Sequence, residues 1–195
     1  MDQSKTDSIM LDIPEHFESK RLLIRAPRSG DGAAVNEAIR ESIAELRPWM
    51  PWAKDIPTPE QSEASIRRSR VEYLEREDMR LLLFDRDTGL LVGSSGLHKI
   101  DWNCRKFEIG YWVRTSCSGQ GYITEAVHAI TDFAVLQLQA NRIQICCDSR
   151  NAASIHVAQK TGFTHEGTIR LDRLNHDGHL RETMIFAKVR GVEFE

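Results

Sequence analysis

Cysteine is scarce in this chain, and its spacing excludes two kinds of site. The four cysteines are Cys104, Cys117, Cys146 and Cys147, and no two of them have the Cys-x-x-Cys spacing of a zinc knuckle. Cys146 and Cys147 are adjacent in a strand-like run, so their side chains point to opposite faces of a sheet. The pattern argues against a secreted disulfide framework and favours reduced thiols in a cytoplasmic protein. The seven histidines form no His-x-x-x-His pair, so no metal site is predicted.

Long hydrophobic runs and an excess of positive charge are also absent. No apolar run approaches the roughly 20 residues that a membrane-spanning helix needs, and residues 1–13 lack the pattern of a signal peptide. The 26 Lys and Arg against 29 Asp and Glu give a formal net charge of -3, whereas a general nucleic-acid-binding protein is usually basic. The length of 195 residues fits one domain. We therefore expect a soluble, cytoplasmic protein that binds neither a membrane nor nucleic acid directly.

The chain does contain a regular succession of strand and helix patterns. Val35, Ile39 and Ile43, for example, recur at the spacing of one helix face. The predicted order is a strand (20–26), helices (31–46 and 58–77), strands (80–85, 90–100 and 105–114), a helix (121–138), a strand (142–148), a helix (151–161) and two strands (163–174 and 179–188). Residues 1–19 precede these elements and are expected to form a flexible leader.

Three of the predicted helices begin with a capping residue. Asp31 stands at the start of the first helix, and Asn151 at the start of the last. Thr58 is followed by Pro59 and then by Gln61, the spacing of a capping box. These side chains are expected to accept hydrogen bonds from the first turns of their helices.

A glycine-containing loop between a strand and a helix, residues 116–121, is the most informative segment. Such a loop directs backbone N–H groups and the positive end of a helix dipole at one spot, which suits a pyrophosphate. Gly119 and Gly121 carry no Cβ, so the backbone can approach phosphates closely. The loop has neither the Lys-Ser/Thr of a triphosphate-binding loop nor a third glycine, since Thr124 takes that position. From these residues alone, a phosphate cradle and a simple tight connection both remain open; a Cys117 nucleophile lacks any supporting Cys-His-Asn spacing.

Five motifs, in one order along the chain, resemble those of a single enzyme family. They are Arg21-Leu-Leu-Ile-Arg25, Leu46-Arg-Pro-Trp-Met-Pro-Trp52, Glu108-Ile-Gly-Tyr-Trp112, Gly119-Gln-Gly-Tyr-Ile-Thr-Glu-Ala126, and Asn151-Ala-Ala-Ser154 through Lys160-Thr-Gly-Phe163. Together they resemble the GNAT superfamily of acetyl-coenzyme A-dependent N-acetyltransferases, and more narrowly its RimJ/RimL group. The resemblance implies an α/β (α+β) fold: one domain over residues 20–190, with a mixed, mostly antiparallel sheet of about seven strands flanked by about four helices.

The resemblance also implies acetyl-coenzyme A as the cosubstrate, without a metal. The loop residues expected to hold its pyrophosphate are Ser116, Cys117, Ser118, Gly119, Gln120, Gly121 and Tyr122. Backbone N–H groups around Tyr111, Trp112 and Val113 are expected to bind the thioester carbonyl as it becomes an oxyanion, where the strand splays from its neighbour. Asn151 would hold the pantetheine arm and cap its helix at once. Ser116 departs from the Gln or Arg that the family commonly has; because backbone N–H groups supply most of the cradle, cofactor binding is expected to survive this loss of one contact, with weaker affinity.

Two side chains take catalytic roles by the same resemblance. Glu108 would accept the proton of the amine, directly or through a water, from a partly desolvated site that raises its pKa. The alternative is an ordinary strand carboxylate paired with Arg105 or Lys106. Ser154 would donate to the departing thiolate, unless its hydroxyl merely bonds the preceding turn of its helix.

The acceptor is the least determined part. Trp49 and Trp52, in a loop broken by two prolines, and the final hairpin (171–180) are expected to frame the acceptor cleft, with Glu108 at its inner end. The favoured acceptor is a protein or peptide N-terminal amine. A small amine (a polyamine, an amino acid or an antibiotic) and a non-catalytic acetyl-coenzyme A sensor stay open, and a homodimer is compatible with the resemblance. The net charge of -3 favours a cationic amine or a basic peptide terminus over an anionic partner.

Overall fold

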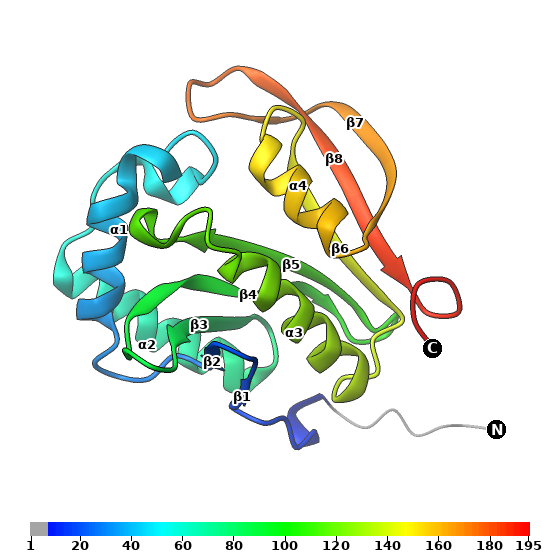
Figure 1. Cartoon of the computed structure of the whole chain (residues 1–195), viewed down its shortest axis with the longest axis horizontal. Coiled ribbons are helices and arrows are strands. Elements are labelled where there is room, and N and C mark those ends of the chain that lie inside the picture. Colours follow the sequence, from blue (N-terminus) through cyan, green and yellow to red (C-terminus); the bar gives the residue numbers. More distant parts are fainter. Residues whose placement is uncertain (1–7) are drawn as a thin grey trace.

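A mixed sheet of eight strands runs through the part of the chain that the computed structural model describes, residues 8–195 (Figure 1). The strand order is β1-β2-β3-β4-β5-β6-β8-β7. The strands are β1 (His16–Glu18), β2 (Leu22–Arg25), β3 (Met79–Asp85), β4 (Leu91–Asp101), β5 (Lys106–Val113), β6 (Arg142–Asp148), β7 (Thr164–Leu174) and β8 (Leu180–Val189). Neighbours are antiparallel except β5 and β6, which are parallel because a helix crosses between them.

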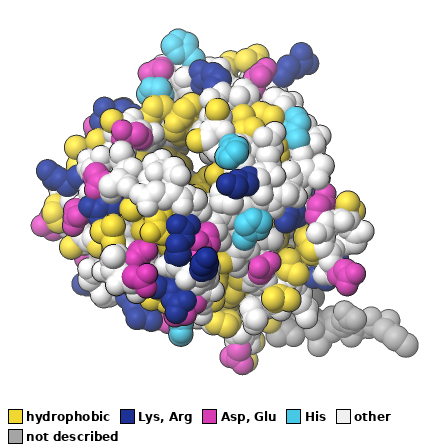
Figure 2. Space-filling model, viewed as in Figure 1, with side chains coloured by type: hydrophobic (Ala, Val, Ile, Leu, Met, Phe, Trp, Pro, Cys, Tyr) yellow, Lys and Arg dark blue, Asp and Glu magenta, His cyan; other side chains and the backbone are white. Residues whose placement is uncertain are grey.

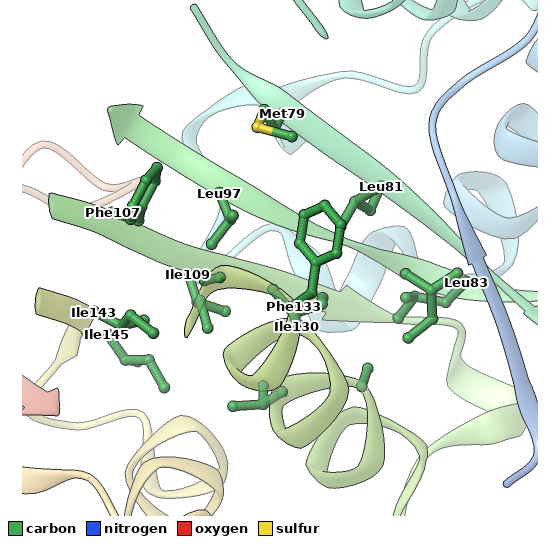
Figure 3. Close-up of a cluster of buried hydrophobic side chains, with 14 of the residues drawn as sticks. Met79, Leu81, Leu83, Leu97, Phe107, Ile109, Ile130, Phe133, Ile143 and Ile145 are labelled. Atoms are coloured by element: carbon green, nitrogen blue, oxygen red, sulfur yellow. The ribbon is translucent and has the colours of Figure 1, made fainter. Parts of the chain in front are cut away.

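Four α-helices cover the two faces of the sheet: α1 (Gly32–Leu46) and α2 (Pro59–Glu75) on one, α3 (Tyr122–Leu136) and α4 (Ala152–Lys160) on the other (Figure 1). Each face has its own core. Leu81 and Ile109 pack with Ile130 of α3 (Figure 3), whereas Leu82 packs with Ile66 of α2. Successive residues of β3 enter different cores because strand side chains alternate between faces. None of the helices within residues 8–195 combines the length and apolarity that crossing a bilayer requires.

The predicted elements are present in the predicted order. The Thr58 hydroxyl accepts from the Gln61 N–H and the Gln61 side chain accepts from the Thr58 N–H, so the capping box is confirmed. Asn151 caps α4 by accepting from the Ser154 N–H. Helix α2 ends two residues before the predicted position, because Arg76 takes a left-handed conformation with φ 63°.

Part of the predicted leader is a strand. Residues 1–7 lie outside the described residues, but His16–Glu18 pair with β2 as an eighth, edge strand of the sheet. The Phe17 ring stacks on Phe133 of α3, with ring centroids 4.4 Å apart. Three residues are too few to show the alternation of apolar and polar side chains that marks a strand. This strand therefore depends on tertiary contacts that the local sequence does not reveal.

The first helix is not capped as predicted. Asp31 occupies the N-cap position, but its carboxylate pairs with Arg25 at 2.6 Å and makes no capping hydrogen bond. Glu63 of α2 instead accepts from the Gly32 N–H at 3.0 Å. A carboxylate from a neighbouring helix thus replaces the local cap, because Arg25 gives Asp31 a stronger, charged partner.

Candidate active site

Strands β5 and β6 separate halfway along their length. Their register runs from Lys106↔Arg142 to Glu108↔Gln144 and, within residues 8–195, no further, although both strands continue. The Arg114 N–H donates to Val92 of β4. Because N–H groups alternate in direction along a strand, those of Tyr111 and Val113 point away from β4, into the gap. Two backbone donors thus face the opened edge, where the sequence predicted splayed backbone.

A cleft of about 650 Å³ occupies this opened edge. It brings together a subset of the predicted site residues, drawn from three parts of the chain: Trp49, Trp52, Tyr111, Trp112, Asn151 and Ser154. The tip of the β7–β8 hairpin also lines it through Leu174, Asn175 and His176. The ring centroids of Trp52 and Trp112 lie 6.1 Å apart, so the loop that carries Trp49 and Trp52 packs against β5. Val113, Glu108 and the loop 116–122 are not among its lining residues.

The loop before α3 keeps three backbone donors available. Gly119 and Gly121 have φ of 73° and 79°, a left-handed conformation that glycine adopts without strain. Within residues 8–195, the N–H groups of Gly119, Gln120 and Gly121 have no hydrogen-bond acceptor. They stand at the N-terminus of a 15-residue helix, a favourable place for an anion. The geometry fits a pyrophosphate cradle.

The first half of the same loop is bonded elsewhere. Ser116 donates its N–H to Glu41 of α1 at 2.8 Å. Cys117 and Ser118 donate theirs to the carbonyls of Arg114 and Thr115, around the short 3-10 turn Thr115–Cys117, and the Cys117 thiol is buried. Bonds from Ser116 and Arg114 hold the pKa of Glu41 at about 2. The backbone of these three predicted residues therefore holds the loop in place, and Gly119, Gln120 and Gly121 carry N–H groups without an acceptor among the described residues.

Arg21 lies beside this loop and was not singled out from the sequence. Its Nη1 donates to the Gln120 carbonyl at 3.0 Å, and its guanidinium lies over the Tyr122 ring, 4.3 Å from the centroid. Its Nε pairs with Glu125 at 2.7 Å. The Tyr122 hydroxyl donates to Asp85. A cationic side chain from the residue just before β2 thus lies beside the loop 119–121. In the sequence, the one signal for Arg21 is its place in the first of the five motifs.

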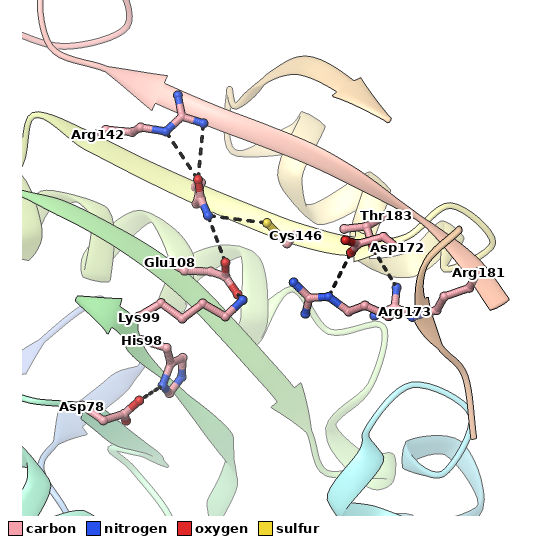
Figure 4. A network of polar contacts seen from close by, with 11 residues as sticks. Asp78, His98, Lys99, Glu108, Arg142, Cys146, Asp172, Arg173, Arg181 and Thr183 are labelled. Carbon is pink, nitrogen blue, oxygen red and sulfur yellow. Dashed lines mark hydrogen bonds and ion pairs between the residues drawn. The ribbon is translucent and has the colours of Figure 1, made fainter. Parts of the chain in front are cut away.

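The Glu108 carboxylate is held in a polar network (Figure 4). Lys99 Nζ lies 2.6 Å from one oxygen, and Gln144 Nε2 donates to the other at 2.9 Å. Burial acts to raise the pKa of Glu108, but the bonds from Lys99 and Gln144 outweigh it and lower the pKa below its usual value. The direction is opposite to the predicted one, and the partner is Lys99 in place of Arg105 or Lys106.

Ser154 faces the cleft from the first turn of α4. Its N–H donates to Asn151 Oδ1 at 3.0 Å, and its carbonyl accepts from the Tyr111 hydroxyl at 3.2 Å. Burial raises the pKa of the Tyr111 hydroxyl that donates this bond. The Ser154 hydroxyl itself has no hydrogen-bond partner within residues 8–195, so the bond to its own preceding turn is not formed.

His98 is a site residue that the sequence did not reveal. Its Nδ1 lies 2.7 Å from the Asp78 carboxylate, and the ring lines the cleft (Figure 4). The ring lies across Gly96 and Gly110: a Cβ at Gly110 would be 3.3 Å from Nε2, and one at Gly96 would be 3.1 Å from Cε1. Two opposed glycines thus make room for an imidazole on the sheet. Nothing local predicts this, because only strand pairing brings Asp78, Gly110 and His98 together.

Comparison with known proteins agrees with this geometry. Residues 21–164 match the model of a family described as the acetyltransferase (GNAT) domain. YdaF of Bacillus subtilis, provisionally named a ribosomal N-acetyltransferase, is 30% identical over 82% of this chain and 88% of its own. The ribosomal-protein-serine acetyltransferase of Escherichia coli is 27% identical over 70% of this chain and 78% of its own. The solved structure of RimL, a ribosomal L7/L12 alpha-N-protein acetyltransferase in complex with coenzyme A, superposes with a TM-score of 0.83 at 21% identity, over 94% of this chain and 99% of that one.

Proposed function

The chain belongs to the acetyltransferase (GNAT) domain family and is an acetyl-coenzyme A-dependent N-acetyltransferase, and we propose that its acceptor is the amino terminus of a protein or peptide. The observation that carries this proposal is the outer half of the cleft. Trp49 and Trp52 stand on one side of it, 37% and 48% exposed, and Asn175 of the final hairpin stands on the other. A chain that continues beyond its amine can leave between these two loops. The names of YdaF and of the Escherichia coli enzyme, which refer to ribosomal proteins, support the same class of acceptor.

The loop before α3 supplies the phosphate contacts. Gly119, Gln120 and Gly121 present their N–H groups to the pyrophosphate, and Arg21, which pairs with Glu125, holds the Gln120 carbonyl beside them. We assign the pantetheine arm to Asn151, which lines the cleft and caps the helix that carries Ser154. Bound in this way, acetyl-coenzyme A supplies the activated acetyl group as a thioester.

His98 is the base in this proposal. An imidazole that donates its Nδ1–H to a carboxylate presents a lone pair at Nε2, and Asp78 provides that carboxylate at 2.7 Å. Nε2 lies over Gly110, next to the backbone donors of the opened edge. The ammonium of the acceptor gives one proton to Nε2, and the neutral amine is then able to attack the thioester carbonyl.

The backbone of β5 and the first turn of α4 complete the transfer. The N–H group of Tyr111, a residue that lines the cleft, donates to the carbonyl oxygen as it becomes negative. Ser154 donates its hydroxyl hydrogen bond to the sulfur as the carbon–sulfur bond breaks. The second proton of the attacking nitrogen ends on the thiolate, so the products are an acetylated amine and a thiol.

A thiol-release assay tests the acceptor class. The purified chain is given acetyl-coenzyme A with N-terminal peptides, polyamines, free amino acids or amine antibiotics, and each peptide has a control whose amino terminus is already blocked. We expect kcat/KM for free peptide termini to exceed that for every small amine by about tenfold or more, since contacts beyond the amine contribute binding energy to the transition state.

Three results would contradict the proposal. Preference for a small amine would assign the chain to that acceptor. Equal release from blocked and free peptides would mean that the terminal amine is not the nucleophile. Acetyl-coenzyme A binding without release for any amine would favour a sensor.

A further inference from the structure

The cleft is lined by more positive than negative side chains. Among its lining residues within 8–195, four are arginines, Arg47, Arg80, Arg173 and Arg181, and Asp148 is the one carboxylate. The whole chain carries a net charge of -3, and Figure 2 shows charges of both signs spread over the face of the molecule that it draws. The positive excess therefore belongs to the cleft and not to the molecule.

Two of the four arginines have carboxylate partners. Arg173 Nε lies 2.9 Å from Asp172 (Figure 4). Arg181 Nε lies 3.8 Å from Asp148, whose carboxylate also pairs with Arg150 at 2.8 Å. Their charges are largely balanced inside the protein.

Arg80 has no carboxylate partner within the described residues. Its Nε and Nη1 donate to the hydroxyls of Ser94 and Ser65, each at 3.3 Å, which is longer than the usual range of about 2.7–3.2 Å. Burial lowers the pKa of the Arg80 guanidinium, and the more distant charges of Asp78 and Glu72 only oppose this effect. A half-buried guanidinium with two weak neutral partners retains capacity for an anion.

Arg80 stands close to the proposed base. It lies directly opposite Gly96 in the β3–β4 register, and Gly96 lies opposite Gly110 in the β4–β5 register. His98 follows Gly96 by two residues on the same face. With strands about 4.8 Å apart and two residues spanning about 6.8 Å, the Cα atoms of Arg80 and His98 are roughly 8 Å apart. The Arg80 guanidinium extends toward Ser94, on the far side of Gly96 from His98, so an anion that it binds would lie within the first few residues of an acceptor whose amine is at His98.

We propose that Arg80 and Ser65 form an anion subsite of the acceptor cleft, and that the acceptor is an amino terminus with a carboxylate side chain in its first few residues. The inference rests on the proposed function. The Ser94 hydroxyl donates to the Leu81 carbonyl, so it positions Arg80. Ser65 accepts from Arg80 and keeps its own proton for the anion. The planar guanidinium offers two parallel donors, which match a carboxylate.

The test uses three peptides that differ only in the second residue, which is Asp, Asn or Lys. Wild type is expected to favour Asp over Asn by about tenfold in kcat/KM, mainly through KM, as a charged hydrogen bond contributes. Arg80→Gln is expected to remove this preference, and Arg80→Lys to keep part of it. Arg68→Gln is the matched control, because Arg68 is exposed on α2 and is not a lining residue of the cleft; it should keep the whole preference.

Each alternative outcome separates this inference from the proposed function. Efficient acetylation of all three peptides without preference for Asp would overturn the subsite and leave the peptide acceptor in place. Equal loss on all three peptides in both Arg80 variants would make Arg80 structural and also overturn it. O-Phosphoethanolamine and ethanolamine are assayed in parallel: Arg80-dependent acetylation of the first, with no peptide acetylated, would reject the peptide acceptor and support the subsite. If Arg80→Gln does not fold, the wild-type preference and Arg80→Lys decide.

Discussion

His98 and Glu108 stand directly opposite each other on β4 and β5, yet their side chains have different partners. Glu108 shares its two oxygens between Lys99 and Gln144, which favours its ionised form and makes it a weaker base. Within the described residues, His98 bonds through Nδ1 only, and its Nε2 lies over Gly110. At the scale of single residues, we therefore base the proposed role of each group on its bonding partners and not on its position in a motif.

Replacing each of the two residues should separate their roles. His98→Asn keeps a side chain of similar size but cannot take up the proton, so we expect kcat to fall about 100-fold or more, as for the loss of a general base. The affinity for acetyl-coenzyme A should stay unchanged. Steady-state kinetics over pH provide the check, since the rise of kcat with pH should disappear in the variant.

Glu108→Gln serves as the comparison, because it keeps the bond from Gln144 and removes only the charge facing Lys99. We expect its kcat and its pH profile to stay near those of wild type. A loss as large as that of His98→Asn, together with a changed pH profile, would restore Glu108 as the base.

The phosphate loop shows how one element depends on another. Its N–H donors lie at the N-terminus of α3. The loop is held from the other face of the sheet by Glu41 of α1, which bonds Ser116 and Arg114. Ser116 replaces the polar or cationic side chain that the resemblance led us to expect, and its backbone is bonded to Glu41. Helix α1 therefore sets the position of a loop that is more than 70 residues away in the chain.

Glu41→Gln should loosen this loop and lower stability in a pH-dependent way. The pKa of Glu41 is about 2 in the fold and 4.5 ordinarily, so its carboxylate stabilises the fold above pH 4.5, and this stabilisation is lost as the pH falls toward 2. We expect Tm at pH 7 to fall by roughly 3 °C or more, equivalent to about 1 kcal/mol for this chain length. The difference should shrink at pH 3, and KM for acetyl-coenzyme A should rise at pH 7.

Glu37→Gln is the matched control for this experiment. Glu37 lies on the same helix and also pairs with Arg114, but its side chain is 68% exposed and, among the described residues, it accepts no hydrogen bond from the loop backbone. Thermal unfolding of both variants gives the answer: equal effects of the two substitutions, at either pH, would speak against a special role of Glu41.

At the scale of the whole molecule, net charge and cleft charge have opposite signs. The net charge of -3 led us to expect a cationic or basic acceptor. The cleft instead gathers four arginines and one carboxylate. A summed charge averages over a surface that carries both signs, whereas an acceptor meets the few groups within a Debye length of the cleft.

The salt dependence of KM distinguishes the influence of the cleft arginines from that of the net charge. If the cleft governs binding, raising the salt from about 0.05 M to about 0.5 M should raise KM for the Asp-containing peptide several-fold, because salt screens its attraction to the arginines. KM for the Lys-containing peptide should fall or stay constant. Measurement of KM for both peptides at the two salt concentrations decides; a larger rise for the Lys-containing peptide would mean that the net charge governs binding.

The sequence by itself determined the succession of elements, the loop before α3, and the family. These properties are local: hydrophobic periodicity, glycine at positive φ and capping residues act within a few positions of one another. The tertiary structure alone decided that residues 16–18 form a strand, that Arg25 binds Asp31, that Lys99 neutralises Glu108, and that His98 meets Asp78. These contacts depend on strand register and on helices packing across the sheet. No local pattern contains that information, because it arises only when distant segments share one core.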